Sequence, residues 1–168
     1  MNSISWLTCV FGFEEDTPHI SIPNGPNDNG VKILGKMADK LVGTDELIAL
    51  YIPLSVDTKV WPHAKDKNGR IVGTVKLIEK PEDMKIEDYY CLDWSELDKN
   101  GNPVKRWPIG WPCEVVHYLK KDECINFRHI VETNTENSFD QWTAGLQSGP
   151  REIKGTPISR DIGLALSK

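Results

Sequence analysis

The sequence of 168 residues lacks the features that mark several common protein classes. None of its apolar runs approaches the roughly 20 residues that a membrane-spanning helix needs, and residues 1–13 show no basic leader or small-residue cleavage site. The cysteines, Cys9, Cys91, Cys113 and Cys124, form no Cys-x-x-Cys pair, so neither a zinc ribbon nor a disulfide scaffold is expected. These absences predict a cytoplasmic protein with reduced cysteines and no membrane partner.

Catalytic signatures are also missing. The chain holds no glycine-rich phosphate loop, no His-Glu-x-x-His and no Gly-x-Ser-x-Gly. Cys113 and His117 would share one face of an extended strand at about 13 Å, which is beyond hydrogen-bond reach. His63, His117 and His129 lack the spacing of metal ligands. We therefore expect neither cofactor nor metal, and the sequence favours a non-catalytic protein.

Positive charge is scarce. The net charge is −5, with 11 Lys and Arg against 17 Asp and Glu in residues 1–100, and 9 against 8 in residues 101–168. Because phosphate neutralisation supplies most non-specific affinity, nucleic-acid binding would need a local basic patch and a specific pocket. The length and the balanced composition predict one soluble domain over residues 1–168.

Tryptophan is abundant, with six in the chain. Trp61, Trp107 and Trp111 each precede a proline, which favours extended backbone and removes a sheet donor, so these indoles are expected at strand ends and in loops. Indoles beside Lys105 and Arg106 suit stacking on a planar nucleobase. The alternative is a tryptophan-rich plug that closes the core of a small barrel.

Periodicity and turn residues predict five or six strands and two or three short helices. The expected strands cover residues 3–13, 47–54, 70–79, 89–94, 112–119 and 125–131. The expected helices cover residues 30–41, capped by Asn27, Asp28 or Asn29, then 139–146, capped by Ser138, and a last helix capped by Ser159. Residues 14–29 and 57–69 are expected to be loops. This order predicts an α+β domain, a small and mostly antiparallel β-barrel flanked by short helices.

Six short segments occur in an order that resembles a known superfamily. They are residues 45–52 (DELIALYI), 69–75 (GRIVGTV), 80–82 (KPE), 111–118 (WPCEVVHY), 128–130 (RHI) and 155–161 (GTPISRD). The first three are similar to EVE domains and the last three to YTH domains, both of the PUA-like superfamily. The likeness covers roughly residues 45–168.

The resemblance implies a reader of a modified base in RNA or DNA, turned out and held in an aromatic cage. Such a cage suits a methylated base, whose added apolar area is buried against indole faces. By the resemblance, Trp94 is the second cage indole. Lys32 stands where the first is found, so Trp61, Trp107 or Trp6 would supply that ring.

Five polar residues are candidates for contacts with nucleic acid. Lys105, Arg106, Arg128 and Arg160 would hold phosphates, and Asp161 would accept a hydrogen bond from a base or sugar. The resemblance implies the last two, because they match the Arg-Asp pair of YTH domains. The alternatives are solvated surface cations and a capping arrangement in which Asp161 lies in a first helical turn.

The tryptophans differ in expected role. Trp107 would face a pocket, whereas Trp111 either faces it or leads a strand and packs inside. Trp61, in a polar loop, is either a mobile ligand contact or an anchor for a protein partner. Trp6 and Trp142 are expected in the core.

The expected function is thus a non-catalytic reader domain whose partner is RNA or DNA carrying a modified base. One alternative is a hydrolase of a modified nucleoside similar to the ASCH group, using Lys76, Thr74 and Glu79. Thr74 and Lys76 would share one strand face, whereas Glu79 would point to the other side. The other alternative is a protein-interaction module built on the Trp61 loop.

Overall fold

The computed structural model describes residues 3–11, 13–59, 61–89, 99–102 and 107–168. Three predicted site residues, Trp94, Lys105 and Arg106, lie outside this part of the chain, as does most of the strand expected over residues 89–94. Within it, no helix has both the length and the apolar character needed to cross a membrane.

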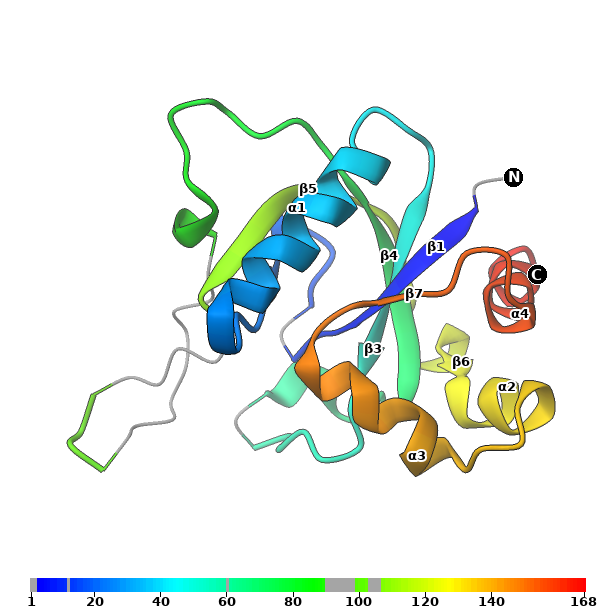
Figure 1. The fold of residues 1–168 in the computed structure, drawn as a ribbon. Helices are drawn as coiled ribbons and strands as arrows, with labels where there is room; N and C mark the ends of the chain where they lie inside the picture. The colour runs from blue at the N-terminus through cyan, green and yellow to red at the C-terminus, as the bar shows by residue number, and fades with distance from the viewer. Residues whose placement is uncertain (1–2, 12, 60, 90–98, 103–106) are drawn as a thin grey trace.

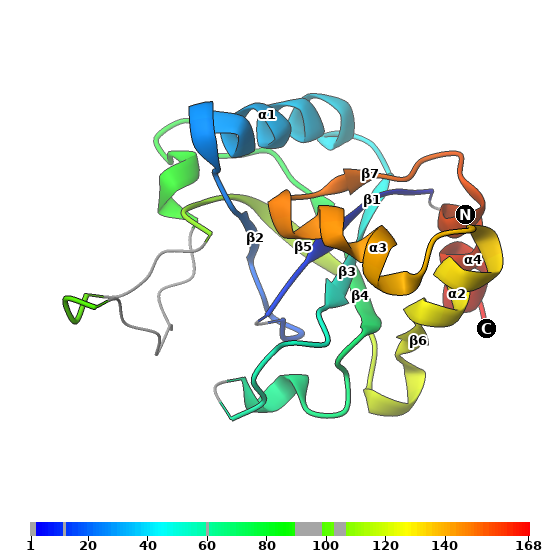
Figure 2. The same ribbon diagram turned by 60° about the horizontal axis from the view of Figure 1, so that its bottom comes forward.

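A curled mixed sheet, a half-barrel, forms the centre of the described chain (Figures 1 and 2). Its strands are β1 (Ile4–Cys9), β2 (His19–Ile22), β3 (Leu47–Ile52), β4 (Arg70–Leu77), β5 (Ile109–Tyr118), β6 (Ile125–Asn126) and β7 (Arg151–Glu152). They run in the order β2-β5-β4-β3-β1-β7, and β6 pairs with the start of β4. Only β1 and β3 pair in parallel among the described strands. The predicted α+β class and the mostly antiparallel pairing are confirmed.

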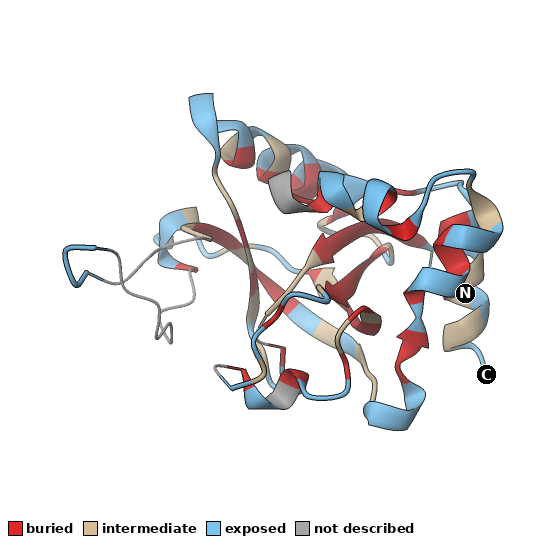
Figure 3. Cartoon of the chain, turned by 90° about the horizontal axis from the view of Figure 1, so that it is seen from below, coloured by how far each residue is buried: buried red, intermediate tan, exposed pale blue. Residues whose placement is uncertain are grey.

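Four α-helices cover the sheet in the described chain. They are α1 (Asn29–Leu41), α2 (Phe127–Asn134), α3 (Phe139–Ala144) and α4 (Pro157–Leu166). Helix α1 lies apart from the other three, which gather on the opposite side of the sheet (Figure 2). In Figure 3, α1 presents its buried residues toward the sheet and its exposed residues away from it.

Strand β3 is buried on both faces, and its alternating side chains belong to two different cores. Its odd-numbered residues pack with α2, α3 and α4, around Phe127 and Phe139. Its even-numbered residues pack with α1, through Met37 and Leu41. Successive strand residues point to opposite faces, so the apolar run that predicted a central strand also divides the core in two.

Helix α1 confirms the predicted helix, but its cap differs. Asn27 and Asp28 adopt left-handed backbone, with φ of 57° and 54°, and the Asp28 side chain makes no capping hydrogen bond. Instead, the amide of Gly30 donates to the carbonyl oxygen of Asn24 at 2.6 Å, and the amide of Val31 donates to Asn24 Oδ1 at 3.2 Å. The left-handed pair turns the chain so that a residue before the turn supplies the acceptors.

Two other expected boundaries are wrong. Residues 14–29 are not all loop, because His19–Ile22 form β2, in which Ile20 and Ile22 are buried. Residues 125–131 contain only the short β6 and then enter α2, because their buried residues recur at the three- and four-residue spacing of a helix.

The last helix begins two residues before the expected cap, Ser159. Thr156 is the cap, since its hydroxyl accepts from the amide of Ser159 at 3.2 Å, and Pro157 occupies the first helical position. Ser159 is buried and its hydroxyl donates to the carbonyl oxygen of Ile4. Ser138 caps α3 as predicted.

Two glycines of α1 should respond in opposite ways to substitution by alanine. A Cβ on Gly30 would lie 2.1 Å from the carbonyl oxygen of Pro23, whereas a Cβ on Gly35 would meet no atom within 4 Å. We expect Gly30→Ala to lower the free energy of unfolding by about 1–3 kcal/mol, and Gly35→Ala to raise it by up to about 1 kcal/mol. Urea unfolding of both variants checks this; equal effects would contradict the close approach at Gly30.

Candidate nucleic-acid interface

The tryptophans divide into buried and partly exposed rings. Trp6, Trp61 and Trp142 are 5%, 8% and 5% exposed, whereas Trp107 and Trp111 are half-buried. The core positions predicted for Trp6 and Trp142 are confirmed. Among the described tryptophans, only Trp107, two residues before β5, and Trp111, the third residue of β5, are therefore partly exposed.

The expectation that Trp61 lies in an exposed loop is wrong. Its amide donates to the carbonyl oxygen of Asp57, and its own carbonyl oxygen accepts from the amide of Ala64, both at 2.9 Å. These bonds fold the loop back on the sheet, and the indole belongs to the same core cluster as Val56 and Ala64. The polar neighbours in the sequence concealed this, because the burial depends on the turn that follows Trp61.

Trp111 is held in a fixed orientation near the start of β5. Its backbone is paired with Ile20 of β2, and its indole N–H donates to the carbonyl oxygen of Ile78 at 2.7 Å. Lys80 Nζ lies 6.0 Å from the ring centroid, at the limit of a cation–π contact. One edge of the indole is therefore tied to the protein while part of the ring remains accessible.

Two separate pairs of rings lie near this end of β5. The ring centroids of Trp107 and Phe11 are 4.4 Å apart in an edge-on arrangement, and those of His19 and Tyr89 are 5.9 Å apart. Burial lowers the pKa of His19 and raises the pKa of Tyr89, so both rings are neutral at pH 7. His19 is paired with Pro112, so it lies with Tyr89 on the opposite face of the β2–β5 pair from Trp111. We call Phe11, Trp107 and Trp111 the β5 aromatic group.

The predicted phosphate contacts that fall in the described chain lie elsewhere. Arg128 on α2 is ion-paired with Glu132 at 3.7 Å and stands 4.9 Å from the ring centroid of Phe139. Arg160 on α4 is exposed and its Nε lies 3.3 Å from Asp161 Oδ1. Helices α2 and α4 are on the side of the sheet away from the start of β5 (Figures 1 and 2). The structure therefore does not bring these residues to the β5 aromatic group.

Asp161 serves the packing of α2 against α4. Its Oδ2 accepts from Asn134 Nδ2 at 2.7 Å, and this hydrogen bond, helped by Arg160, holds the pKa of the carboxyl below its usual range. Asp161 is the fifth residue of α4, beyond the first turn, so the capping alternative is wrong. Its acceptor oxygens already have partners within the protein.

The side chains of the hydrolase alternative have separate partners. Thr74 is fully buried, and its Oγ1 lies 2.6 Å from His117 Nδ1. Lys76 Nζ is ion-paired with Asp45 at 3.2 Å, and Glu79 is exposed. A buried hydroxyl is out of reach of a substrate, so this arrangement lends that alternative no support. No cluster of three or more potential metal ligands occurs in the described residues.

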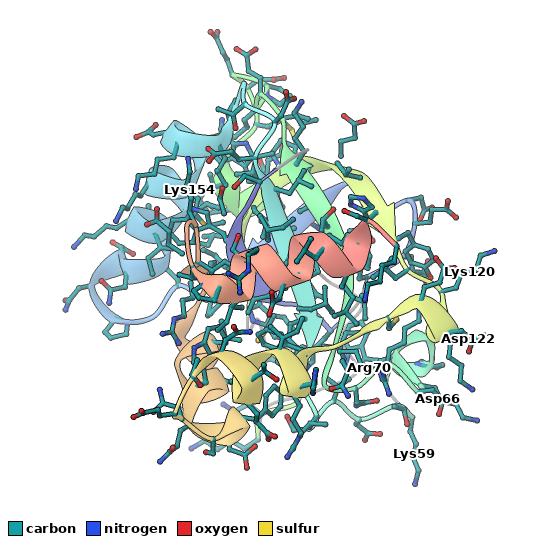
Figure 4. The ribbon with its side chains drawn as sticks, turned by 90° about the vertical axis from the view of Figure 1, so that its right-hand side faces the viewer. Lys59, Asp66, Arg70, Lys120, Asp122 and Lys154 are labelled. Atoms are coloured by element: carbon teal, nitrogen blue, oxygen red, sulfur yellow. The ribbon has the colours of Figure 1, made fainter. Side chains whose placement is uncertain are left out.

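A charged hollow that the sequence did not predict lies below the sheet, beside the start of β4 (Figure 4). It has a volume of about 790 Å³ and lies between the loop before β4 and the short 3₁₀ turn η4 (Lys121–Glu123). Its lining residues are Thr58, Lys65, Asp66, Asn68, Arg70, Lys121 and Asp122. Asp66 and Lys121 form an ion pair at 2.9 Å, which lowers the pKa of Asp66 and raises that of Lys121. The polar loop sequence gave no sign that these charges would surround one space.

Comparisons with protein-family models, with curated proteins and with solved structures find no match to this chain. The fold and the contacts described above are therefore the observations from which a function can be inferred. The PUA-like resemblance stays a prediction that rests on short motifs.

The described cysteines should be poor nucleophiles. Burial raises the pKa of Cys9 and of Cys113 to about 12, and it also raises the pKa of Cys124. Because the thiolate is the reactive form, we expect native Cys91→Ser protein to react with a disulfide reagent at pH 8 far more slowly than the same protein unfolded in guanidinium. Rapid labelling of Cys113 in the native protein would contradict this.

Asp161 should give stability that depends on pH. The pKa of Asp161 is lower in the folded protein than in the unfolded chain. The contribution of Asp161 to the free energy of unfolding is therefore complete above the unfolded pKa of about 4, and it is lost as the pH falls through the folded pKa. Asp161→Asn should therefore destabilise the protein at pH 7, and the difference from wild type should shrink below pH 4. Urea unfolding of the two proteins at pH 7 and below pH 4 measures this difference. A difference that is the same at both pH values would refute the pH dependence.

Proposed function

We propose that the protein is a non-catalytic reader domain of the PUA-like superfamily, of EVE/YTH type, that binds a modified base in RNA or DNA. The single observation that carries this proposal is the contrast among the described tryptophans. Three are core residues, whereas Trp107 and Trp111, four residues apart, are half-buried, and the ring of Trp107 contacts that of Phe11. Partly exposed indoles with restrained orientations suit stacking on a base.

The rings offer a physical basis for recognising a modified base. The indole of Trp111 is already fixed by its bond to Ile78, so little side-chain entropy is lost when a ligand stacks on it. Each stacked base contributes about 1–3 kcal/mol. A methyl group adds apolar area that aromatic faces bury favourably, at roughly 25 cal/mol per Å².

The burial pattern narrows the choice of the first cage ring. Trp6 and Trp61 are buried, so of the three tryptophans considered for this role Trp107 is the one with accessible surface. Lys32 itself is exposed on α1. We therefore assign the first ring to Trp107 and, by the family resemblance, the second to Trp94.

Replacing Trp107 should weaken binding to an oligonucleotide that carries the recognised modification. We expect Trp107→Ala to reduce affinity about tenfold to a hundredfold, because it removes one stacking partner worth about 1–3 kcal/mol. Trp94→Ala should do the same and should remove the quenching of indole fluorescence. Fluorescence anisotropy against a panel of modified and unmodified oligonucleotides, at two salt concentrations, measures both effects.

Trp142→Phe is the matched control, because that indole is buried in the core on the other side of the sheet. It should keep the affinity and the preference for the modified base. A steep salt dependence without preference for any modification would refute the reader function and leave plain electrostatic binding.

A further inference from the structure

The charged hollow contains a cation, Arg70, that has no counter-ion among the described residues. Arg70, the first residue of β4, is half-buried, yet no carboxylate of the described residues lies within ion-pair distance of its guanidinium. Taking a charge partly out of water is unfavourable unless it is paired. An arginine in this position is ready to bind an anion.

A second cation lies close behind it. Lys67 is 9% exposed, and its ammonium lies 4.8 Å from the ring centroid of Tyr118, where it has a cation–π contact but no carboxylate within the described chain. The charges of Lys67 and Arg70 both act to lower the pKa of the Cys124 thiol, against the larger effect of burial. The two cations therefore share one neighbourhood, at the start of β4.

The surroundings of the hollow are positive although the protein is acidic. Residues 57–70 and 120–123 carry six Lys and Arg and four Asp and Glu, in a chain whose net charge is −5. Figure 4 shows Arg70, Asp66, Asp122 and Lys120 gathered on one side of α4, whereas Lys154 lies on the other side. Asp66 and Lys121 neutralise each other in an ion pair, so the other charged residues that line the hollow are Lys65, Arg70 and Asp122, with a net charge of +1.

We propose that this hollow is a phosphate-binding site in which Arg70 forms the central contact and Lys65 supplies a second one. A guanidinium presents paired N–H donors that match two phosphate oxygens, which a lysine cannot do. Asn68 holds the loop in place, since its Nδ2 donates to the carbonyl oxygen of Val56 at 3.1 Å. The phosphate site itself does not depend on the proposed function. Only the identification of its phosphate with the backbone of a nucleic acid rests on that function.

The site is separate from the β5 aromatic group. Arg70 begins β4, whereas Trp111 is bonded to Ile78, just beyond the other end of the same strand. Eight residues of strand at about 3.3 Å each put the two at most about 25 Å apart along a curled sheet. This distance corresponds to roughly seven nucleotides at 3.4 Å per step of a helical strand. A strand longer than this can use both contacts at once.

The test has two arms and uses the intact chain. Inorganic phosphate should shift the backbone amide resonances of residues 65–70, and Arg70→Gln should abolish the shift. An oligonucleotide longer than the 25 Å span should lose about tenfold in affinity with Arg70→Gln, and its logarithmic salt slope should decrease by about one, while the preference for the modified base is kept. Lys65→Gln, an exposed position, should give a smaller loss without endangering the fold.

Lys36→Gln is the matched control, because it removes one exposed positive charge from α1, far from the hollow. Phosphate shifts that survive Arg70→Gln, or an oligonucleotide affinity that falls equally with Lys36→Gln, would overturn the site. Phosphate shifts in a protein that binds no oligonucleotide would keep the site and reject the reader function. Oligonucleotide binding that needs Trp107 but not Arg70 would keep the reader and reject the site as its backbone contact.

Discussion

The burial of β3 on both faces is the constraint on which the rest of the structure depends. Each of its residues is assigned to one of two cores, so a shift by one residue would exchange both sets of side chains at once. The register of β3 fixes its parallel neighbour β1 and its antiparallel neighbour β4. Through β4 it also fixes the two candidate regions, since Arg70 begins that strand and Ile78 follows it. Functional geometry at the surface is thus set by packing at the centre.

Local patterns in the sequence predicted the elements that are long and strongly periodic. The apolar spacing in α1 predicted a helix, and the apolar run of strand length predicted a central strand; both elements are confirmed, although β3 ends at Ile52. Short segments were harder, because a run such as residues 125–131 fits a strand or a helix until tertiary packing decides. In α2, Phe127, Ile130 and Val131 face one core at helical spacing, which length and apolar content alone did not reveal.

The candidate interface was less predictable, because it depends on contacts between residues distant in sequence. Asp161 was recognisable as an acceptor, but its partner Asn134 lies 27 residues away on another helix. Trp61 looked exposed because its neighbours are polar, although a turn folds it inward. The hollow at Arg70 joins two loops that the sequence separates by about fifty residues. One local signal was present, a lone arginine directly after the Asn68-Gly69 turn, and nothing in the sequence showed that no carboxylate of the described residues pairs with it.

The distribution of charge bears on how such a protein would discriminate between bases. Phosphate contacts position a ligand, whereas contacts to the base specify it. Arg128 and Arg160 are engaged with carboxylates of their own helices, and the chain as a whole is acidic. In the proposed reader, non-specific electrostatic affinity would therefore be small, and stacking would supply a large share of the binding free energy. Because the preference for a modified base resides in that share, a low background of phosphate binding increases selectivity. In the proposed reader, Arg70 at the start of β4 would orient the nucleic-acid strand through one phosphate without reducing the preference for the modified base.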